Sequence, residues 1–182
     1  MALGNVFVAK GNEDAKVQIA GGSEWLDILG IRDIKVDYDV ATAERKGDEK
    51  TIAFSSNIMA ADVTLDDVAF ADLSTLAALL GQSISTSGTT PDQISSLKIT
   101  AGELPYFKLE CKSKSVEMKG TGDAVNDVHL VIYKLKISDI SKQVKMGDYW
   151  SVSLKCKAIP DPDNNNAIAE IKAYETATNI GS

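Results

Sequence analysis

The sequence predicts a mostly β protein, either a β-sandwich or a partly open barrel, with one short flanking α-helix and long loops. Apolar and polar residues alternate along several segments, which is the spacing of strands that bury one face. Clusters of Gly, Pro, Asn and Asp separate these segments, as expected of turns. Only residues 72–81 have the spacing of an amphipathic helix. Together these observations favour seven or more strands closed around one core.

Length and composition favour one domain over residues 1–182, with residues 1–30 as its N-terminal arm or segment. The hydrophobic content of 44% is ordinary for a globular protein and is sufficient for a sizeable core. Cys111 and Cys156 lie in alternating segments and are expected to be buried free thiols, with a disulfide or a metal site as the alternative.

The charge and hydropathy of the chain disfavour two classes of partner. A formal net charge of -7 opposes non-specific attraction to nucleic acid, which depends on lysine and arginine displacing counterions. No run of about 18 apolar residues is present, so no membrane span is expected. The first residues lack the basic and apolar regions of a signal peptide, so synthesis in the cytoplasm without signal-directed secretion is expected.

The first clear strand is IKVDYDV, residues 34–40, in which apolar residues alternate with charged ones. Its wet face is mostly acidic and carries Asp37 and Asp39. The charged segment TAERKGDEK, residues 42–50, then predicts an exposed loop or hairpin tip. A solvated turn is one interpretation of this loop, and a docking arm with both charge signs is the other.

Strand character resumes near Thr51 and continues to Phe70, with a bulge expected at Asp66 and Asp67. Asp72 or Ser74 is suited to cap the helix that follows, and Gly81 is suited to the left-handed position after its end. The predicted apolar face of this helix consists of Leu73, Leu76, Ala77, Leu79 and Leu80.

Residues 82–103 are rich in Ser, Thr and Gly and predict a long loop, or a loop with one weak strand. The next strand, within residues 104–120, points Phe107, Leu109 and Cys111 inward. Its outward face carries a basic stripe suited to meet the acidic face of a neighbouring subunit. The stripe consists of Lys108, Lys112 and Lys114.

Three further segments complete the predicted strands and turns. Residues 127–140 form the most apolar strand, with both faces covered over its first half. Residues 149–160 alternate again, and DPDNNN, residues 161–166, has the composition of a turn. The last strand, from residue 167, is expected to pair antiparallel with the strand before it.

Residues that could carry chemistry are few. His129 has Asp127 on the same strand face, but no nucleophile motif accompanies them, so a structural histidine is favoured over catalysis. The turn at residues 161–166 resembles a calcium-ligand composition yet lacks the spacing of an EF-hand loop, so a hydrated turn is favoured. No phosphate-binding spacing is present, and Trp25 and Trp150 are expected to be core or interface anchors. Neither enzymatic activity nor a cofactor is expected.

The order of these segments resembles the major tail proteins, or tail tube proteins, of tailed bacteriophages. The resemblance covers residues 30–176. It rests on IKVDYDV with its charged loop and FSSNI, on VTLDDVAFADLSTLAALLG, on PYFKLECKSKSV followed by DVHLVIYKLKIS, and on WSVSLKCKAIPD with a final strand ending YETA.

The resemblance implies a β-sandwich with a flanking helix that assembles into six-fold rings stacked into a hollow tube. The genome passes through the commonly acidic lumen without specific binding, and the protein resides in the virion tail after assembly in the host cytoplasm. Implied partners are other copies of the chain and the tail tip or baseplate, tape measure and tail terminator proteins. Four strands of each subunit extend into a continuous inner barrel. The implied inter-ring loop consists of Glu44, Arg45, Lys46, Gly47, Asp48 and Glu49, and the implied lumen face carries Asp37 and Asp39.

Other classes of protein remain as alternatives. One is the inner tube of a contractile injection or secretion system, or another virion β-protein such as a capsid decoration subunit. The other alternative is a carbohydrate-binding β-sandwich or a small hydrolase that uses His129. Sugar binding normally uses exposed aromatic platforms, and the chain is only 6% aromatic.

Overall fold

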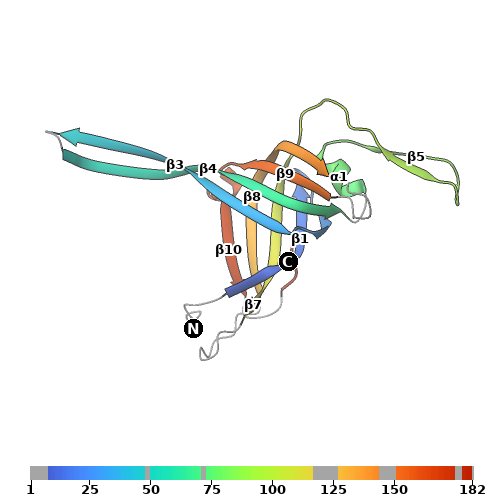
Figure 1. Ribbon diagram of the computed structural model, residues 1–182, viewed down its shortest axis with the longest axis horizontal. Helices are drawn as coiled ribbons and strands as arrows, with labels where there is room; N and C mark the ends of the chain where they lie inside the picture. The colour runs from blue at the N-terminus through green and yellow to red at the C-terminus, as the bar shows by residue number, and fades with distance from the viewer. Residues whose placement is uncertain are drawn as a thin grey trace.

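The computed structural model describes residues 8–47, 50–70, 73–116, 127–143, 151–174 and 178–181 (Figure 1). Eight strands form one sheet in which every pairing is antiparallel. They are β1 (Val8–Ile19), β2 (Trp25–Gly30), β3 (Asp33–Gly47), β4 (Lys50–Phe70), β7 (Tyr106–Val116), β8 (Asp127–Gln143), β9 (Ser151–Ala158) and β10 (Ala169–Tyr174). The described part also contains one α-helix, α1 (Leu73–Leu79), a 3-10 turn η1 (Pro162–Asn164), and a separate hairpin of β5 (Ile84–Ser87) and β6 (Ile94–Leu97). The predicted mostly β class is confirmed.

The sheet curls until its pairings form a closed circuit. The strands follow the order β8, β7, β1, β2 and β4, and β9 closes the circuit because it pairs with both β4 and β8. β3 continues outside the circuit along β4. Closure gives each strand of the circuit a neighbour on both sides over part of its length, which is the usual advantage of a barrel over an open sheet.

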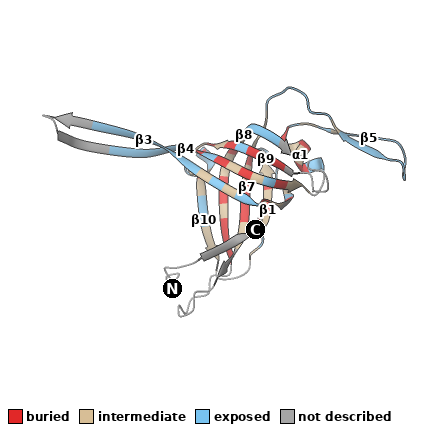
Figure 2. Ribbon diagram, in the orientation of Figure 1, coloured by how far each residue is buried: buried red, intermediate tan, exposed pale blue. Residues whose placement is uncertain are grey.

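The core occupies the interior of this circuit, where the buried residues gather in Figure 2. Alternation along each strand points every second side chain inward. On β7 these are Phe107, Leu109 and Cys111, as predicted, and on β9 they are Val152, Leu154, Cys156 and Ala158. Both faces of β8 are buried over its first half, which was also predicted.

The N-terminal residues that the structure describes do not form an arm beside the fold. β1 lies inside the sheet between β2 and β7, and its inward residues Ala15 and Val17 are fully buried. The signal in the sequence is weak here because charged and polar residues interrupt the apolar spacing of β1, and pairing on both edges compensates for this.

The last strand is also placed differently from the prediction. β10 does not form a hairpin with β9; it pairs with the first half of β8, whereas β9 pairs with the second half. The turn at residues 161–166 closes with a bridge between Asp161 and Ala167, so the chain leaves the edge of β8 briefly and returns to it in the same direction. β9 and β10 therefore run one after the other along a single long strand.

Helix α1 follows the predicted bulge, which is confirmed by a register shift between Leu65 and Val68 and a positive φ at Asp67. Asp72, one of the two predicted caps, lies outside the described residues.

The end of α1 is a Schellman motif, in which the Gly81 N–H donates to Ala78 and the Gln82 N–H donates to Ala77. Leu79 and Leu80 are buried as predicted. Leu73 is 40% exposed, however, and Thr75 is buried in its place, with its hydroxyl donating to the Asp27 carbonyl.

Replacing Gly81 by Ala is expected to destabilise the protein by about 1–2 kcal/mol, because Gly81 has a φ of 62° and a left-handed residue with a Cβ costs that much. The new Cβ would also lie 3.3 Å from Cδ of Pro105. Urea unfolding measures the change. Gly30→Ala is the control, since it has open space around the added Cβ, and an equal loss in both variants would contradict the explanation.

Residues 82–103 contain two strands where a long loop, or a loop with one weak strand, was expected. β5 and β6 form a two-stranded hairpin that is not paired with the large sheet in the described structure. Figure 1 shows this hairpin and the β3–β4 hairpin projecting from opposite ends of the molecule.

Candidate functional site

The feature of the fold best suited to function is the hairpin formed by β3 and β4, here called the long hairpin, and in particular its outer part. Its strands are paired from Asp33 and Asp66 out to Gly47 and Lys50. β9 accompanies β4 only as far as Ala61, so beyond that point the hairpin has no further strand beside it in the described structure. Residues 37–44 and 55–59 are all exposed, so this segment contributes little to the core.

One face of the long hairpin carries an apolar stripe, defined as Tyr38, Val40 and Ile58. These side chains continue the face on which Ile34 and Val36 pack against the core. A bulge at residue 59 shifts the register, so Ile58 lies opposite Val40. The three side chains are 47%, 51% and 55% exposed, respectively. A contiguous exposed apolar surface of this kind is typical of a contact site for another molecule.

The opposite face of the same strands is charged and extends across β4, β9 and the second half of β8. Register pairing places on it six carboxylates and four lysines: Asp33, Asp37, Asp39, Asp62, Asp66 and Asp139, with Lys35, Lys136, Lys155 and Lys157. This set is called the charged face. Carboxylates outnumber lysines, so it has an acidic excess.

Asp37 and Asp39, predicted on an exposed acidic face, are both exposed there, but each has a lysine partner. Lys35 Nζ lies 2.6 Å from Asp37 Oδ2. Lys157 contacts Asp39 and also lies 3.0 Å from Asp62 Oδ1. Hydrogen bonds to Asp39 and then to Asp62 raise the pKa of Lys157. The acidic field of the two aspartates is thus partly neutralised within the subunit.

Two of the backbone edges that are open in the described structure lie on opposite sides of this region. The outer edge of β3 has no strand beside it from Asp33 to Gly47. On the far side of the strip formed by β3, β4, β9 and β8, the edge of β8 beyond Lys136 is also unpaired, because β7 ends its pairing there. Open edges on opposite sides of one strip are suited to pair between copies.

Of the two predictions for residues 42–50, an exposed loop or a hairpin tip, the structure has the end of a hairpin. Thr42 to Gly47 belong to β3, and Lys50 begins β4, because pairing with the opposite strand continues almost to the tip. Glu44 is exposed. Asp48 and Glu49 lie outside the described residues, and so do the side chains of Arg45 and Lys46.

The predicted basic stripe on β7 does not form a free surface. Lys108 lies over the rings of Trp25 and Tyr133, at 5.1 and 5.4 Å from their centroids. Lys112 Nζ pairs with Asp127 Oδ2 at 2.9 Å. The side chain of Lys114 lies outside the described residues, as does Trp150. Two of the three lysines are therefore engaged within their own subunit.

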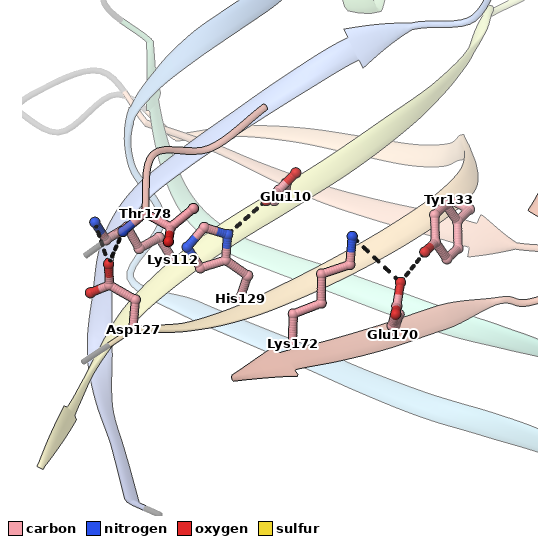
Figure 3. Close-up of polar contacts among 8 residues, drawn as sticks. All are labelled: Glu110, Lys112, Asp127, His129, Tyr133, Glu170, Lys172 and Thr178. Atoms are coloured by element: carbon pink, nitrogen blue, oxygen red, sulfur yellow. Dashed lines mark hydrogen bonds and ion pairs between the residues drawn. The ribbon is translucent and has the colours of Figure 1, made fainter. Parts of the chain in front are cut away.

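The C-terminal segment contacts the ion pair of Lys112 and Asp127 (Figure 3). The Thr178 N–H donates to Asp127 Oδ2 at 2.7 Å, and Ile180 is buried. Gly181 approaches Trp25 so closely that an added Cβ would lie 2.6 Å from the indole Nε1. Residues 178–181 thus contact the start of β8 and the start of β2, and Thr178 caps the buried Asp127 carboxylate.

Asp127→Asn is expected to lower the melting temperature at neutral pH and to flatten the loss of stability on acidification. Burial raises the pKa of Asp127, but the ion pair with Lys112 and the Thr178 N–H outweigh it, so the pKa is lowered. A lowered folded-state pKa stabilises above the unfolded value near 3.8, and this contribution disappears as the pH falls through the folded value. Melting curves from pH 7 to pH 2 test this. Asp33→Asn, in an exposed pair with Arg32, serves as control.

His129 is completely buried beside Asp127, but the two side chains are not hydrogen-bonded to each other. His129 Nδ1 lies 2.7 Å from Glu110 Oε1 (Figure 3). The centroid of the Tyr174 ring lies 4.6 Å from that of the imidazole. Because a carboxylate accepts, the proton is assigned to Nδ1, which leaves Nε2 without a partner among the described residues. An imidazole with no exposed surface cannot reach a substrate, so this geometry favours a structural role.

The acidic turn at residues 161–166 satisfies its own polar groups. Asn164 Nδ2 donates to Asp161 Oδ2 at 2.6 Å, and the N–H groups of Asn164 and Asn166 donate to the Asp161 carbonyl. Asn165 and Asn166 both have positive φ, which asparagine tolerates in turns. Across the described ranges no three His, Cys, Asp or Glu side chains gather as metal ligands.

A cavity of about 440 Å³ lies between this turn, the β1–β2 turn and the start of β7. Two tyrosines line it, Tyr106 and Tyr133. Lysine ammonium groups lie over both rings, within 5.0 to 5.4 Å of the centroids. These lysines reduce the aromatic surface open to a stacked sugar, which disfavours the carbohydrate-binding alternative.

Both cysteines are expected to resist thiol reagents in the folded protein and to react fully after unfolding. Burial raises the thiol pKa of Cys111 to about 12 and that of Cys156 to about 12, and both are free. Labelling with a maleimide at pH 7.5, with and without urea, tests this. Labelling of the native protein at the unfolded rate would contradict the described burial.

Sequence reasoning missed the roles of two residues. Alternation places Glu110 on the outward face of β7, but it is buried against His129, and the bridging role of Lys157 was not anticipated. The outward position of Lys157 in an alternating strand was a usable signal, but its partner on β3 is more than a hundred positions away in the chain.

No protein-family model matches this chain, and no curated protein resembles its sequence closely enough to count as a match. None of the described helices has the length and apolar character needed to cross a membrane.

Proposed function

We propose that this protein is a structural subunit of a tube, in which six-fold rings stack as in the tail tubes of tailed bacteriophages. The observation that carries the proposal is the long hairpin with its strip of four strands, open at both edges in the described structure. The order of sequence segments that resembles the major tail proteins supports the same function. The proposed role requires no catalytic activity and no cofactor.

The open edges provide a physical route to a ring. If the β3 edge of one copy pairs with the β8 edge of the next, the four-stranded strip continues from subunit to subunit. Such a contact joins two different surfaces, so it repeats until the rotation closes. Backbone hydrogen bonds across the junction would satisfy the open edges in the assembly.

The charged face suits the lining of a channel for DNA. In a ring of this kind the strip would form the inner wall, with the acidic excess toward the lumen. Six copies of a chain with net charge -7 carry a formal charge of about -42. Phosphates repelled by such a wall would slide along it without binding, and the lysine partners of Asp37 and Asp39 would moderate the repulsion.

The proposal places the protein in a virion tail, assembled in the host cytoplasm. Its partners would be further copies of itself and the tail tip or baseplate, tape measure and tail terminator proteins. DNA would pass through the lumen without a specific binding site.

Negative-stain electron microscopy of the purified protein, combined with sedimentation velocity, tests the proposal. Rings or tubes with a central channel are the expected result at high protein concentration. A protein that stays monomeric at high concentration, and also fails to polymerise on added tail-tip proteins, would overturn it. Tubes whose six-fold symmetry is absent in class averages would contradict the ring size.

A further inference from the structure

The hairpin of β5 and β6 is an arm that the described part of its own subunit does not cover. Together with the two residues that follow it, residues 84–99 are here called the polar arm. Its strands make only four residue pairs, from Ile84 and Leu97 to Ser87 and Ile94. Gln82 anchors its base through hydrogen bonds with Thr100. An isolated two-stranded hairpin is marginally stable in water, so this arm would gain stability from a partner surface.

The polar arm presents exposed apolar side chains and an exposed lysine. Ile94 is 65% exposed and Ile99 is 70% exposed. Lys98, next to Ile99 in sequence, is exposed and has no ion-pair partner among the residues that the structure describes. The arm therefore offers apolar contact together with one positive charge.

The long hairpin offers the complementary features at the opposite end of the molecule (Figure 1). Its apolar stripe includes Val40, and Glu44 lies four residues further along the same strand face. Glu44 is exposed and has no ion-pair partner within the described ranges. Four residue steps separate Val40 from Glu44, and four separate Ile94 from Lys98. Each separation is about 13 Å in an extended chain.

We propose that the polar arm of one copy docks on the apolar stripe of a second copy, with Ile94 against Val40 and Lys98 beside Glu44. The two surfaces project in opposite directions from one subunit, so they meet only between copies. The contact joins unlike surfaces and therefore repeats, and as a contact between tube subunits it rests on the proposed function. Apolar burial supplies affinity, and the Lys98–Glu44 pair sets the register.

Charge reversal provides the first test. Lys98→Glu and Glu44→Lys are each expected to raise the concentration needed for assembly about tenfold or more, because like charges would face each other. The double variant carries a reversed pair in every copy and should recover most of the loss. Asp92→Lys, at the exposed tip of the same arm, is the control. Failure of the double variant to recover, with each single variant folded by circular dichroism, would overturn the pairing.

The apolar contact is tested by Ile94→Asp against Ile171→Asp. Both isoleucines are 65% exposed, so neither change should unfold the subunit, and melting curves check this. Only Ile94→Asp is expected to weaken assembly. Equal assembly of both variants, at the concentration that the original chain requires, would contradict the docking of the arm.

Cross-linking separates this inference from the proposed function. Ile94→Cys and Val40→Cys chains are mixed and treated with a short bis-maleimide, since the native cysteines are buried. A mixed dimer in excess of either homodimer is expected, whether or not tubes form. Mixed dimers without tubes would support the docking of the arm and contradict the proposed tube. Tubes without mixed dimers would contradict the docking of the arm and support the proposed tube. Cross-links mainly between two chains that both carry Ile94→Cys would also contradict the docking.

Discussion

Shortening the long hairpin is expected to abolish assembly and to leave the subunit folded. In this variant residues 41–57 are replaced by Asn-Gly, which is suited to a tight turn between Val40 and Ile58. The removed side chains whose exposure is described, residues 41–44 and 55–57, are all exposed, so unfolding free energy should change by less than about 1 kcal/mol. Assembly should fall below detection, because both the outer β3 edge and Glu44 are lost.

The measurement combines urea unfolding with sedimentation velocity at the concentration where the original chain assembles. Ala43→Ser keeps the hairpin and changes one exposed side chain, so it serves as the control. A shortened variant that still forms rings would show that the outer part of the hairpin is not part of the assembly contact. A variant that fails to fold would show that the hairpin belongs to the core, contrary to its exposure.

His129→Leu is expected to destabilise the protein by about 3–5 kcal/mol, because it leaves the Glu110 carboxylate buried without its partner. The double variant Glu110→Leu with His129→Leu should recover most of this loss, since two apolar side chains can replace a buried polar pair at little cost. The sum of the two single losses should therefore greatly exceed the loss in the double variant.

Urea unfolding of the four proteins completes this double-mutant cycle. Additive losses would show that the two side chains act independently and would contradict the described contact. Assembly of His129→Leu is expected to persist at temperatures where the variant is folded, as for a structural histidine. Loss of a measurable hydrolytic activity, with folding intact, would revive the catalytic alternative.

Much of the fold could be predicted from alternation, because inward and outward residues on β7 and β9 differ sharply in polarity. The bulge at Asp66 and Asp67 and the glycine after α1 were also visible, since both depend on local backbone geometry. Strand partners at long range were harder to predict. The sequence contains no local sign that β10 would follow β9 along β8.

The candidate site was predicted in part. Asp37 and Asp39 do share an exposed strand face, because a period of two determines this locally. The same period places Lys112 and Glu110 on the outward face of β7, but both are engaged within the subunit, Lys112 with Asp127 and Glu110 with the buried His129. Such pairing depends on tertiary packing, which alternation along one strand does not encode. The pairing of two strands in the polar arm was missed because Ser, Gly and Pro, which favour turns, interrupt the strand-forming Ile and Thr residues there.

The strand circuit also implies an order in which the strand pairings form during folding. The long hairpin joins neighbouring strands and, like other hairpins, forms on a scale of about 1–10 μs. The circuit closes only when β1 meets β7 and β4 meets β9, contacts between residues roughly 90 positions apart, and such distant pairings form slowly. During folding the long hairpin, with its exposed apolar stripe, is therefore expected to form before the body that carries it. A newly made chain is most vulnerable to premature association in that interval, and slow closure favours dilute refolding or protection by a chaperone.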